Sequence, residues 1–109
     1  MLASGLQAFH SANTSGCPFT SYMPGESLVH GDACLPNIIG RDDGTVNGYI
    51  DLGEMGVGDV EVDLSAAVWS LQYNLGPGLG ERFLRACGSP DPTEQHVRRL
   101  WTIYATRDA

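Results

Sequence analysis

Apolar residues recur every three or four positions in several parts of the chain, which is the spacing of one face of a helix. The first such part covers residues 2–11. The second begins near Leu64 and stops at the Gly-Pro-Gly sequence of residues 76–78. The third runs from Leu79 to a stop at Gly88. We therefore predict helices in these three places and a fourth near the end of the chain.

The fourth helix is predicted from the sequence SPDPTEQHVRRLW. Asp91 is the expected cap, Pro92 is the expected first helical residue, and Glu94 lies three positions beyond the cap. The stripe expected to face the core consists of Val97, Leu100, Trp101 and Tyr104. By the same spacing, the aromatic side chains expected in the core are Trp69, Tyr73, Trp101 and Tyr104.

Short apolar runs between the first and second helices predict strands. One run is Leu28 and Val29, a second starts at Ile38, and the third is VNGYIDL, residues 46–52. The intervening RDDGT predicts a turn around Asp43-Gly44 that makes the last two runs a hairpin. Residues 53–63, which are rich in glycine, are predicted as loop. The layout is α+β, with a small hairpin packed on several helices.

The charge balance narrows the classes of partner. Thirteen acidic against six basic residues give a formal net charge of −7. Phosphate backbones and anionic membranes need a clustered basic face, so we expect neither nucleic acid nor a membrane as partner. No run approaches the roughly 18 apolar residues of a spanning helix. The three cysteines form no CxxC pair, which favours a reduced cytoplasm over a disulfide framework or a zinc site.

Three polar residues around the predicted hairpin have the chemistry that phosphoryl transfer needs. Asp32 precedes the hairpin in the sequence LVHGDACLPNIIG, Asn37 follows five positions later, and Asp51 lies at the end of the third strand. Transfer from ATP requires a carboxylate that orients a hydroxyl and accepts its proton, and hard oxygen ligands for Mg²⁺. We expect the hairpin to bring these three side chains within reach of one divalent cation.

The sequences HGDACLPN and GYIDLGEMGVGDVEVDLSAA resemble the C-terminal lobe of the aminoglycoside phosphotransferases, and most of all the 3′-phosphotransferases that inactivate kanamycin and neomycin. The family motif is His-Gly-Asp, four residues and Asn, followed by Ile-Asp-x-Gly. It is matched here by His30, Gly31, Asp32, Asn37, Ile50, Asp51 and Gly53. Weaker similarity extends from LQAFHSANTSGCPF to the last helix. The resemblance implies the C-terminal lobe of a protein-kinase-like fold.

The resemblance also implies an activity and a set of roles. The reaction would be ATP-dependent phosphorylation of an aminoglycoside alcohol group, which confers antibiotic resistance. Asp32 would be the catalytic base or hydroxyl-orienting residue, and His30 would brace the catalytic loop and the metal-binding segment. Asn37 and Asp51 would bind Mg²⁺ and through it the nucleotide, so that the cofactors are Mg²⁺ and ATP and the partner is a cationic aminoglycoside.

Several other acidic residues are weaker candidates. Glu54 and Glu61 are candidates for contact with a substrate amine, and Asp108 resembles a remnant of the family's acidic tail. Asp59 and Asp63 resemble the acidic pair that follows the family's metal loop, and we assign them to the helix start and to loop bracing. Cys34, inside the motif, is expected to serve packing.

The chain departs from the family in three ways. It has no counterpart of the N-terminal nucleotide lobe and contains no lysine, only TSYMPGESLV joins Phe19 to His30, and the last residues are IYATRDA. We therefore expect residues 1–109 to be a single partial domain. Because positioning and a preorganised, dry site supply much of the rate of such enzymes, we expect low or no activity of this chain alone. A partner chain that supplies the missing lobe, or a homodimer, stays possible.

Two alternatives stay open. The first is a non-catalytic remnant that binds Mg²⁺–nucleotide or a cationic ligand. The second, ranked lower, is a metal-dependent phosphohydrolase that uses Asp32 and Asp51. Such sites usually recruit more histidine or carboxylate ligands, whereas His10 and His96 lie outside the cluster and are expected to be ordinary surface or core residues.

Overall fold

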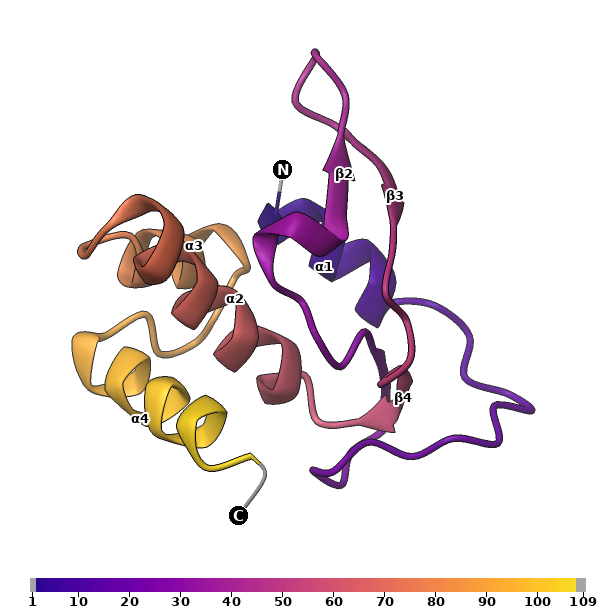
Figure 1. Cartoon of the computed structure of the whole chain (residues 1–109). Helices are drawn as coiled ribbons and strands as arrows, with labels where there is room; N and C mark the ends of the chain where they lie inside the picture. Colours follow the sequence, from indigo (N-terminus) through magenta and orange to yellow (C-terminus); the bar gives the residue numbers. More distant parts are fainter. Residues whose placement is uncertain (1, 108–109) are drawn as a thin grey trace.

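The computed structural model describes residues 2–107 and confirms the α+β class. The helices are α1 (Leu2–His10), α2 (Glu61–Leu75), α3 (Gly80–Ala86) and α4 (Glu94–Ala105), and a short 3₁₀ turn is η1 (Leu35–Asn37). The strands are β1 (Ser27–Val29), β2 (Ile38–Gly40), β3 (Val46–Tyr49) and β4 (Gly56–Gly58). Figure 1 shows α2, α3 and α4 gathered on one side, while the ribbon of β2 and β3 projects beside α1.

The predicted hairpin is present as the antiparallel pair β2–β3. Ile38 pairs with Tyr49 and Ile39 with Gly48, and the turn closes at Gly44, which has a φ of 87°. Alternation along the strands turns Ile38 inward and Ile39 outward. The inner face rests on α1, where the hydroxyl of Tyr49 donates to the backbone oxygen of Gly5 at 2.6 Å. The hairpin is therefore anchored to the body by its inner face.

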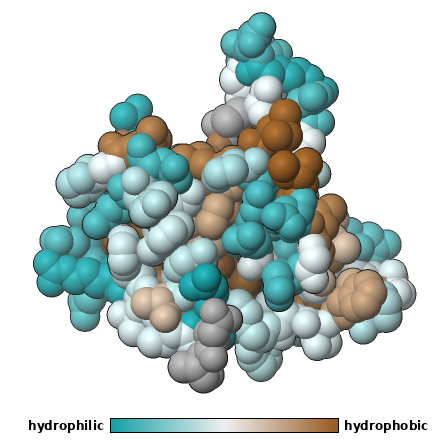
Figure 2. Space-filling model, in the orientation of Figure 1, coloured by the Kyte–Doolittle hydropathy of each residue, from teal (hydrophilic) through white to brown (hydrophobic). Residues whose placement is uncertain are grey.

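The outer face of this ribbon stays apolar and exposed. Ile39 is 39% exposed, Ile50 is 50% exposed and Leu52 is 40% exposed. Figure 2 shows hydrophobic surface gathered along the lower part of the projecting ribbon. Three large apolar side chains on or directly after one hairpin are thus exposed together, although they are not the only exposed large apolar residues among residues 2–107.

The prediction of loop for residues 53–63 was wrong in two places, at residues 56–58 and from Glu61 onward. Residues 56–58 form β4, which pairs antiparallel with β1 through Leu28 and Val57. A three-residue strand with glycine at each end has one side chain and hence no alternating pattern to detect. The glycines are needed because neighbouring segments come close: a Cβ on Gly58 would lie 2.6 Å from the Cβ of Ser21. Helix α2 then begins at Glu61, whose N–H is accepted by the Asp59 side chain at 2.9 Å, as expected of a residue at the helix start.

The predicted start of the last helix was also wrong. The cap of α4 is Thr93, whose hydroxyl oxygen accepts the N–H of His96 at 3.2 Å. Asp91 does not cap the helix, because its carboxylate accepts the Thr93 hydroxyl proton at 2.8 Å and lies in the preceding loop with Pro92. Both Asp and Thr are good caps, so local sequence could not decide between them.

The core lies where the four helices and the start of β2 meet. Its buried apolar side chains include Leu6, Ala33, Ile38, Leu64, Ala67, Val68, Leu84 and Leu100. Of the predicted aromatic core, Tyr104 is buried and Trp69 and Trp101 are half-buried. Tyr73 is 74% exposed, which contradicts the prediction, and it stacks flat on Trp69 with the ring centroids 4.9 Å apart. No helix within residues 2–107 combines the length and the apolar character needed to cross a membrane.

Candidate functional site

The segment from His30 to Asn37 joins β1 to β2 and is held from behind by a buried carboxylate. Asp63, in the first turn of α2, accepts the backbone N–H of His30 and that of Gly31, each at 2.8 Å. His10 of α1 donates to the same carboxylate at 2.7 Å. Asp63 is fully buried. Each of these three groups donates a hydrogen bond to its carboxylate, so the cost of burying the carboxylate is offset. The expected bracing by Asp63 is present.

Gly31 is required by a close backbone approach. It has a φ of 93°, and a Cβ there would lie 2.2 Å from the backbone oxygen of Glu54. The loop before β2 and the loop after β3 therefore touch at this point. Any larger residue would push Glu54 and Asp32 apart.

His30 links the same two loops from inside. Its Nδ1 accepts the backbone N–H of Asp32 at 3.1 Å, and its Nε2 faces the backbone oxygen of Ile50 at 2.9 Å. Since an N–H donor faces Nδ1 and a carbonyl faces Nε2, the ring carries its proton on Nε2. The imidazole thus fixes the residue before Asp51 relative to Asp32.

Asp32 and Asn37 lie in direct contact. The Asn37 side-chain amide donates to the backbone oxygen of Asp32 at 2.9 Å and to its carboxylate at 3.1 Å. The backbone oxygen of Asn37 accepts the N–H of Ile50 at 2.9 Å. These contacts orient Asn37 so that its amide oxygen has no hydrogen-bond partner within residues 2–107. That oxygen is the atom an Mg²⁺ ion would take.

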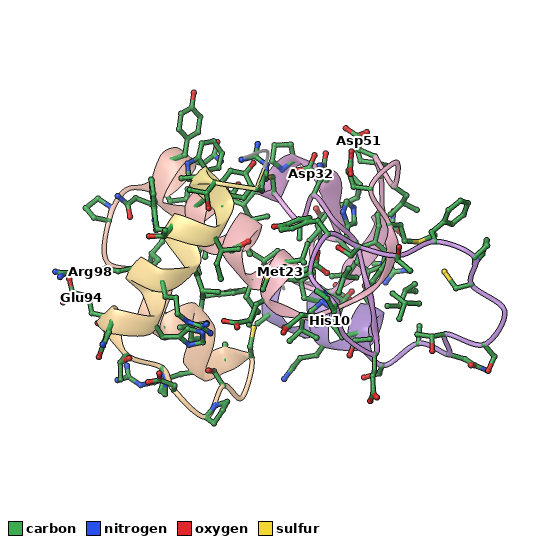
Figure 3. All side chains as sticks on the ribbon, turned by 90° about the horizontal axis from the view of Figure 1, so that it is seen from below. His10, Met23, Asp32, Asp51, Glu94 and Arg98 are labelled. Carbon is green, nitrogen blue, oxygen red and sulfur yellow. The ribbon has the colours of Figure 1, made fainter. Side chains whose placement is uncertain are left out.

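Asp51 stands out in its backbone as well as its exposure. Within residues 2–107 it is the one non-glycine residue with positive φ, at 62°. Its carboxylate is exposed and makes no hydrogen bond to the described part of the chain. Such strain persists where surrounding contacts impose it, and it clusters at functional sites. Figure 3 shows Asp51 and Asp32 at the same edge of the molecule, away from Glu94 and Arg98 on the outer side of α4.

Cys34 belongs to the packing under this loop. Its sulfur lies 3.4 Å from the Asp32 carboxylate and 3.7 Å from the Tyr104 hydroxyl. Burial raises the pKa of the Cys34 thiol, and the Asp32 charge acts in the same direction. A protonated, partly buried thiol is a poor nucleophile, which agrees with the packing role expected from the sequence.

A hollow of about 230 Å³ lies beside Asp32. It is lined by Tyr22, Gly31, Asp32, Glu54 and Arg107. The weak candidate Glu54 is thus brought together with Asp32. Glu61 is not among these residues, because its carboxylate pairs with Arg99 and with His96. Asp108 lies outside the described residues.

Arg107 is a residue of this hollow that the sequence did not indicate. Its guanidinium lies 3.8 Å from the ring centroid of Tyr104 and donates to the Tyr104 backbone oxygen at 2.6 Å. No motif or periodicity marks this position. Its contacts with Tyr104 are local, and only its place in the hollow depends on how the end of the chain lies against the loop of Asp32. The Arg107 guanidinium therefore lines the same hollow as the carboxylates of Asp32 and Glu54.

A conventional metal cluster does not occur in residues 2–107, where no three His, Cys, Asp or Glu side chains converge to hold an ion. The candidate set instead combines the Asp51 carboxylate with the Asn37 amide oxygen near Asp32. Mg²⁺ is commonly bound through one or two carboxylates together with water and substrate phosphates. The donor set therefore fits Mg²⁺ better than zinc, which takes three or four nitrogen, sulfur or carboxylate ligands.

The chain is similar in sequence to known aminoglycoside 3'-phosphotransferases. The "Probable aminoglycoside 3'-phosphotransferase" of Lactococcus lactis is 45% identical over 64 residues. The aminoglycoside 3'-phosphotransferase of Niallia circulans is 47% identical over 53 residues, and that of Escherichia coli is 34% identical over 71 residues. These matches cover 58%, 47% and 65% of this chain but 24%, 20% and 26% of the relatives. The chain thus spans about a quarter of their length or less.

The fold also has a solved counterpart. The aminoglycoside phosphotransferase APH(3'')-Id from Streptomyces rimosus superposes with a TM-score of 0.70 at 21% identity, over 91% of this chain and 57% of that chain. This likeness confirms the kinase-like fold predicted from the motif. The model of the phosphotransferase enzyme family matches residues 19–101, which is more than half of the 109 residues. This chain therefore belongs to the phosphotransferase enzyme family.

Proposed function

We propose that the chain carries the catalytic and magnesium-binding part of an aminoglycoside phosphotransferase, which transfers a phosphoryl group from ATP to an alcohol group of a cationic aminoglycoside. The observation that carries this proposal is the contact of Asp32 with Asn37, whose backbone in turn holds Ile50 next to Asp51, within a family of phosphotransferases. The relatives' printed names support the substrate class.

Asp32 is the residue proposed to act on the acceptor. Its carboxylate borders the hollow, and the Asn37 amide holds one of its oxygens. A carboxylate fixed in this way orients the acceptor hydroxyl and takes its proton as the phosphoryl group is transferred. His30 acts only through the backbone of Asp32 and Ile50, so it is a positioning residue.

Asn37 and Asp51 are the residues proposed to hold Mg²⁺. The Asn37 amide oxygen and the Asp51 carboxylate have no partner within residues 2–107, and the Asp51 carboxylate is exposed. When bound, the ion neutralises charge on the nucleotide phosphates. The exposed apolar side chains of Ile50 and Leu52 beside Asp51 offer a surface for the nucleotide base.

Glu54 is proposed to contact an amine of the acceptor. It lines the same hollow as Asp32, and the close approach of Gly31 keeps it there. An ammonium group near both carboxylates would be attracted, although Arg107 offsets part of this charge. The chain's net charge of −7 favours a cationic acceptor over an anionic one. A cytoplasmic location and a role in antibiotic resistance belong to this proposal.

For a polypeptide of these 109 residues alone we expect weak magnesium–nucleotide binding and transfer at or below detection. The described site lies on an exposed edge, where water reaches Asp51. Electrostatic stabilisation is strongest in a preorganised site that excludes water, and positioning supplies roughly 7–11 kcal/mol in such enzymes. Burial of the exposed ribbon face by a further lobe would raise the rate.

The test measures three signals on the purified chain. Label from ATP is followed into kanamycin and into free phosphate, and binding of Mg²⁺–ATP is titrated. Asp32→Ala tests whether transfer depends on the proposed catalytic carboxylate. Asp51→Asn tests whether binding of Mg²⁺–ATP depends on the proposed metal ligand. Asp42→Asn, at an exposed aspartate of the hairpin turn, is the matched control. We expect binding that falls at least tenfold in Asp51→Asn and is unchanged in Asp42→Asn.

The outcomes separate the alternatives. Labelled kanamycin that disappears in Asp32→Ala would establish an active phosphotransferase. Binding without transfer would favour the binding module, and release of free phosphate without labelled kanamycin would favour the phosphohydrolase. Binding that is equal in Asp51→Asn and the parent chain would refute the proposed metal site.

A further inference from the structure

A second cavity, of about 470 Å³, lies between α1, the start of α2, the α3–α4 connection and α4. It shares no lining residue with the hollow at Asp32. Leu6 and Leu64 are buried side chains of its wall, and Cys87 completes the apolar part. Cavities of this size between helices, with an apolar wall and few polar groups, are typical of small-molecule sites. The proposed phosphotransferase activity does not use this cavity.

Two carboxylates, of Glu61 and Asp91, line the cavity, and that of Glu61 is paired with basic side chains. Arg99 donates to both carboxylate oxygens of Glu61, and His96 lies 2.9 Å from the same carboxylate. The other ring nitrogen of His96 faces the backbone oxygen of Asp91 at 2.8 Å. An anionic ligand would lose its hydration here without finding a free cation, because His96 and Arg99 already pair with Glu61. The cavity therefore favours an uncharged molecule over an anion.

One wall residue keeps an unused hydrogen-bonding atom. His10 donates from Nε2 to the Asp63 carboxylate, and its Nδ1 has no partner within residues 2–107. Since Nε2 carries the proton toward the carboxylate, Nδ1 of the neutral ring is an acceptor. His10 lines the cavity, and its side chain is 13% exposed. Figure 3 shows His10 well away from Asp32 and Asp51.

We propose that this cavity is a binding site for a small neutral aromatic alcohol, which packs its ring against Leu6, Leu64 and Cys87 and donates its hydroxyl to Nδ1 of His10. The apolar wall supplies affinity, and His10 supplies orientation. Because His10 also contacts Asp63, which holds His30 and Gly31, the ligand lies directly behind the loop of Asp32. The site stands whether or not the chain transfers phosphate.

The test compares three probes of similar shape on the full chain: 1-naphthol, naphthalene and 1-naphthoate. Binding is measured by fluorescence or calorimetry at pH 7. One hydrogen bond is worth about 3- to 10-fold in affinity, so 1-naphthol should bind that much more tightly than naphthalene. 1-Naphthoate should bind more weakly than 1-naphthol by at least tenfold. Equal binding of 1-naphthol and 1-naphthoate would overturn the proposal.

Location is tested with cysteines. Saturating 1-naphthol should slow the modification of Cys87 by N-ethylmaleimide at least fivefold, read by mass spectrometry. Cys17, in the loop after α1, is the internal control and should react at an unchanged rate. Cys87→Phe fills the cavity and should abolish binding, whereas Cys17→Phe should not. If Cys87→Phe fails to fold, the protection experiment decides alone: no protection of Cys87, or equal protection of Cys17, refutes the site.

Discussion

Asp63 accepts the backbone N–H of His30 at 2.8 Å, across 33 positions of sequence. Through this contact the first turn of α2 fixes the start of the loop that carries Asp32. The second oxygen of the same carboxylate accepts the N–H of Gly31, and His10 supplies a further donor. The geometry of the candidate site thus depends on a residue that does not border the hollow.

The Asp63→Asn substitution should destabilise the fold strongly. An amide keeps one acceptor oxygen but turns its NH₂ group toward a backbone N–H, which leaves a buried donor unpaired. We expect a loss of about 2–4 kcal/mol in the free energy of unfolding, measured by urea denaturation. Asp42→Asn, on the exposed turn, should change it by less than about 0.5 kcal/mol. Similar midpoints for both variants would contradict the bracing role.

Substitutions at Asp51 should separate backbone strain from metal binding. Glycine accepts a φ of 62° without cost, so Asp51→Gly should leave stability equal or raise it by up to about 1 kcal/mol. Asp51→Ala should be less stable than Asp51→Gly by about 1 kcal/mol, because a Cβ is disfavoured at this φ and glycine has none. Both variants should lose Mg²⁺–ATP binding. A variant that keeps binding would remove Asp51 from the metal site, and equal stabilities of the two variants would argue against strain.

The corrected start of α4 makes a direct prediction. Thr93→Ala removes the oxygen that accepts the N–H of His96, and it should lower stability by about 1 kcal/mol. Asp91→Ala removes only a contact to the Thr93 side chain and should cost a few tenths of a kcal/mol. Thermal denaturation of the two variants checks this order. The reverse order would restore Asp91 as the cap.

Stability should fall in alkaline solution because buried acids resist ionisation. Burial raises the pKa of Cys87 to about 11 from an ordinary value of 9.0, and burial followed by the Cys34 contact raises the pKa of Tyr104 to about 12 from 10.0. Above pH 9 the unfolded chain releases protons that the folded chain retains. The stabilisation is therefore full below pH 9 and is lost as the pH rises toward 11 and 12.

Urea denaturation at pH 8, 10 and 11 measures this loss. In Cys87→Ala the decline between pH 9 and 11 should be smaller, since one of the contributing groups is gone. Cys87 should also react slowly with thiol reagents at pH 8, because little thiolate is present. A decline of the same size in the variant would exclude Cys87 as its cause.

The fold class and the hairpin were confirmed, whereas the roles of the site residues stay predictions. His30, Asp32 and Asn37 are linked by hydrogen bonds, and Asn37 contacts the backbone of Ile50, next to Asp51. Glu54 was a weak candidate that the hollow supports as a neighbour of Asp32. The places of Arg107 and His10 could not be predicted, because each depends on a segment distant in the sequence. Arg107 borders the hollow together with Asp32 and Glu54, and His10 contacts Asp63 of α2.

The sequence by itself determined the helices, the hairpin, the family and the positions of the polar motif. Those features depend on local periodicity, turn residues and short-range spacing, which neighbouring residues fix. Only the tertiary structure decided that β4 exists, that Thr93 caps α4, that Tyr73 is exposed and that the Asp51 carboxylate has no hydrogen-bond partner within residues 2–107. Each of these depends on which distant backbone or side chain comes into contact, since strand pairing and burial are properties of packed segments and not of a single stretch of chain.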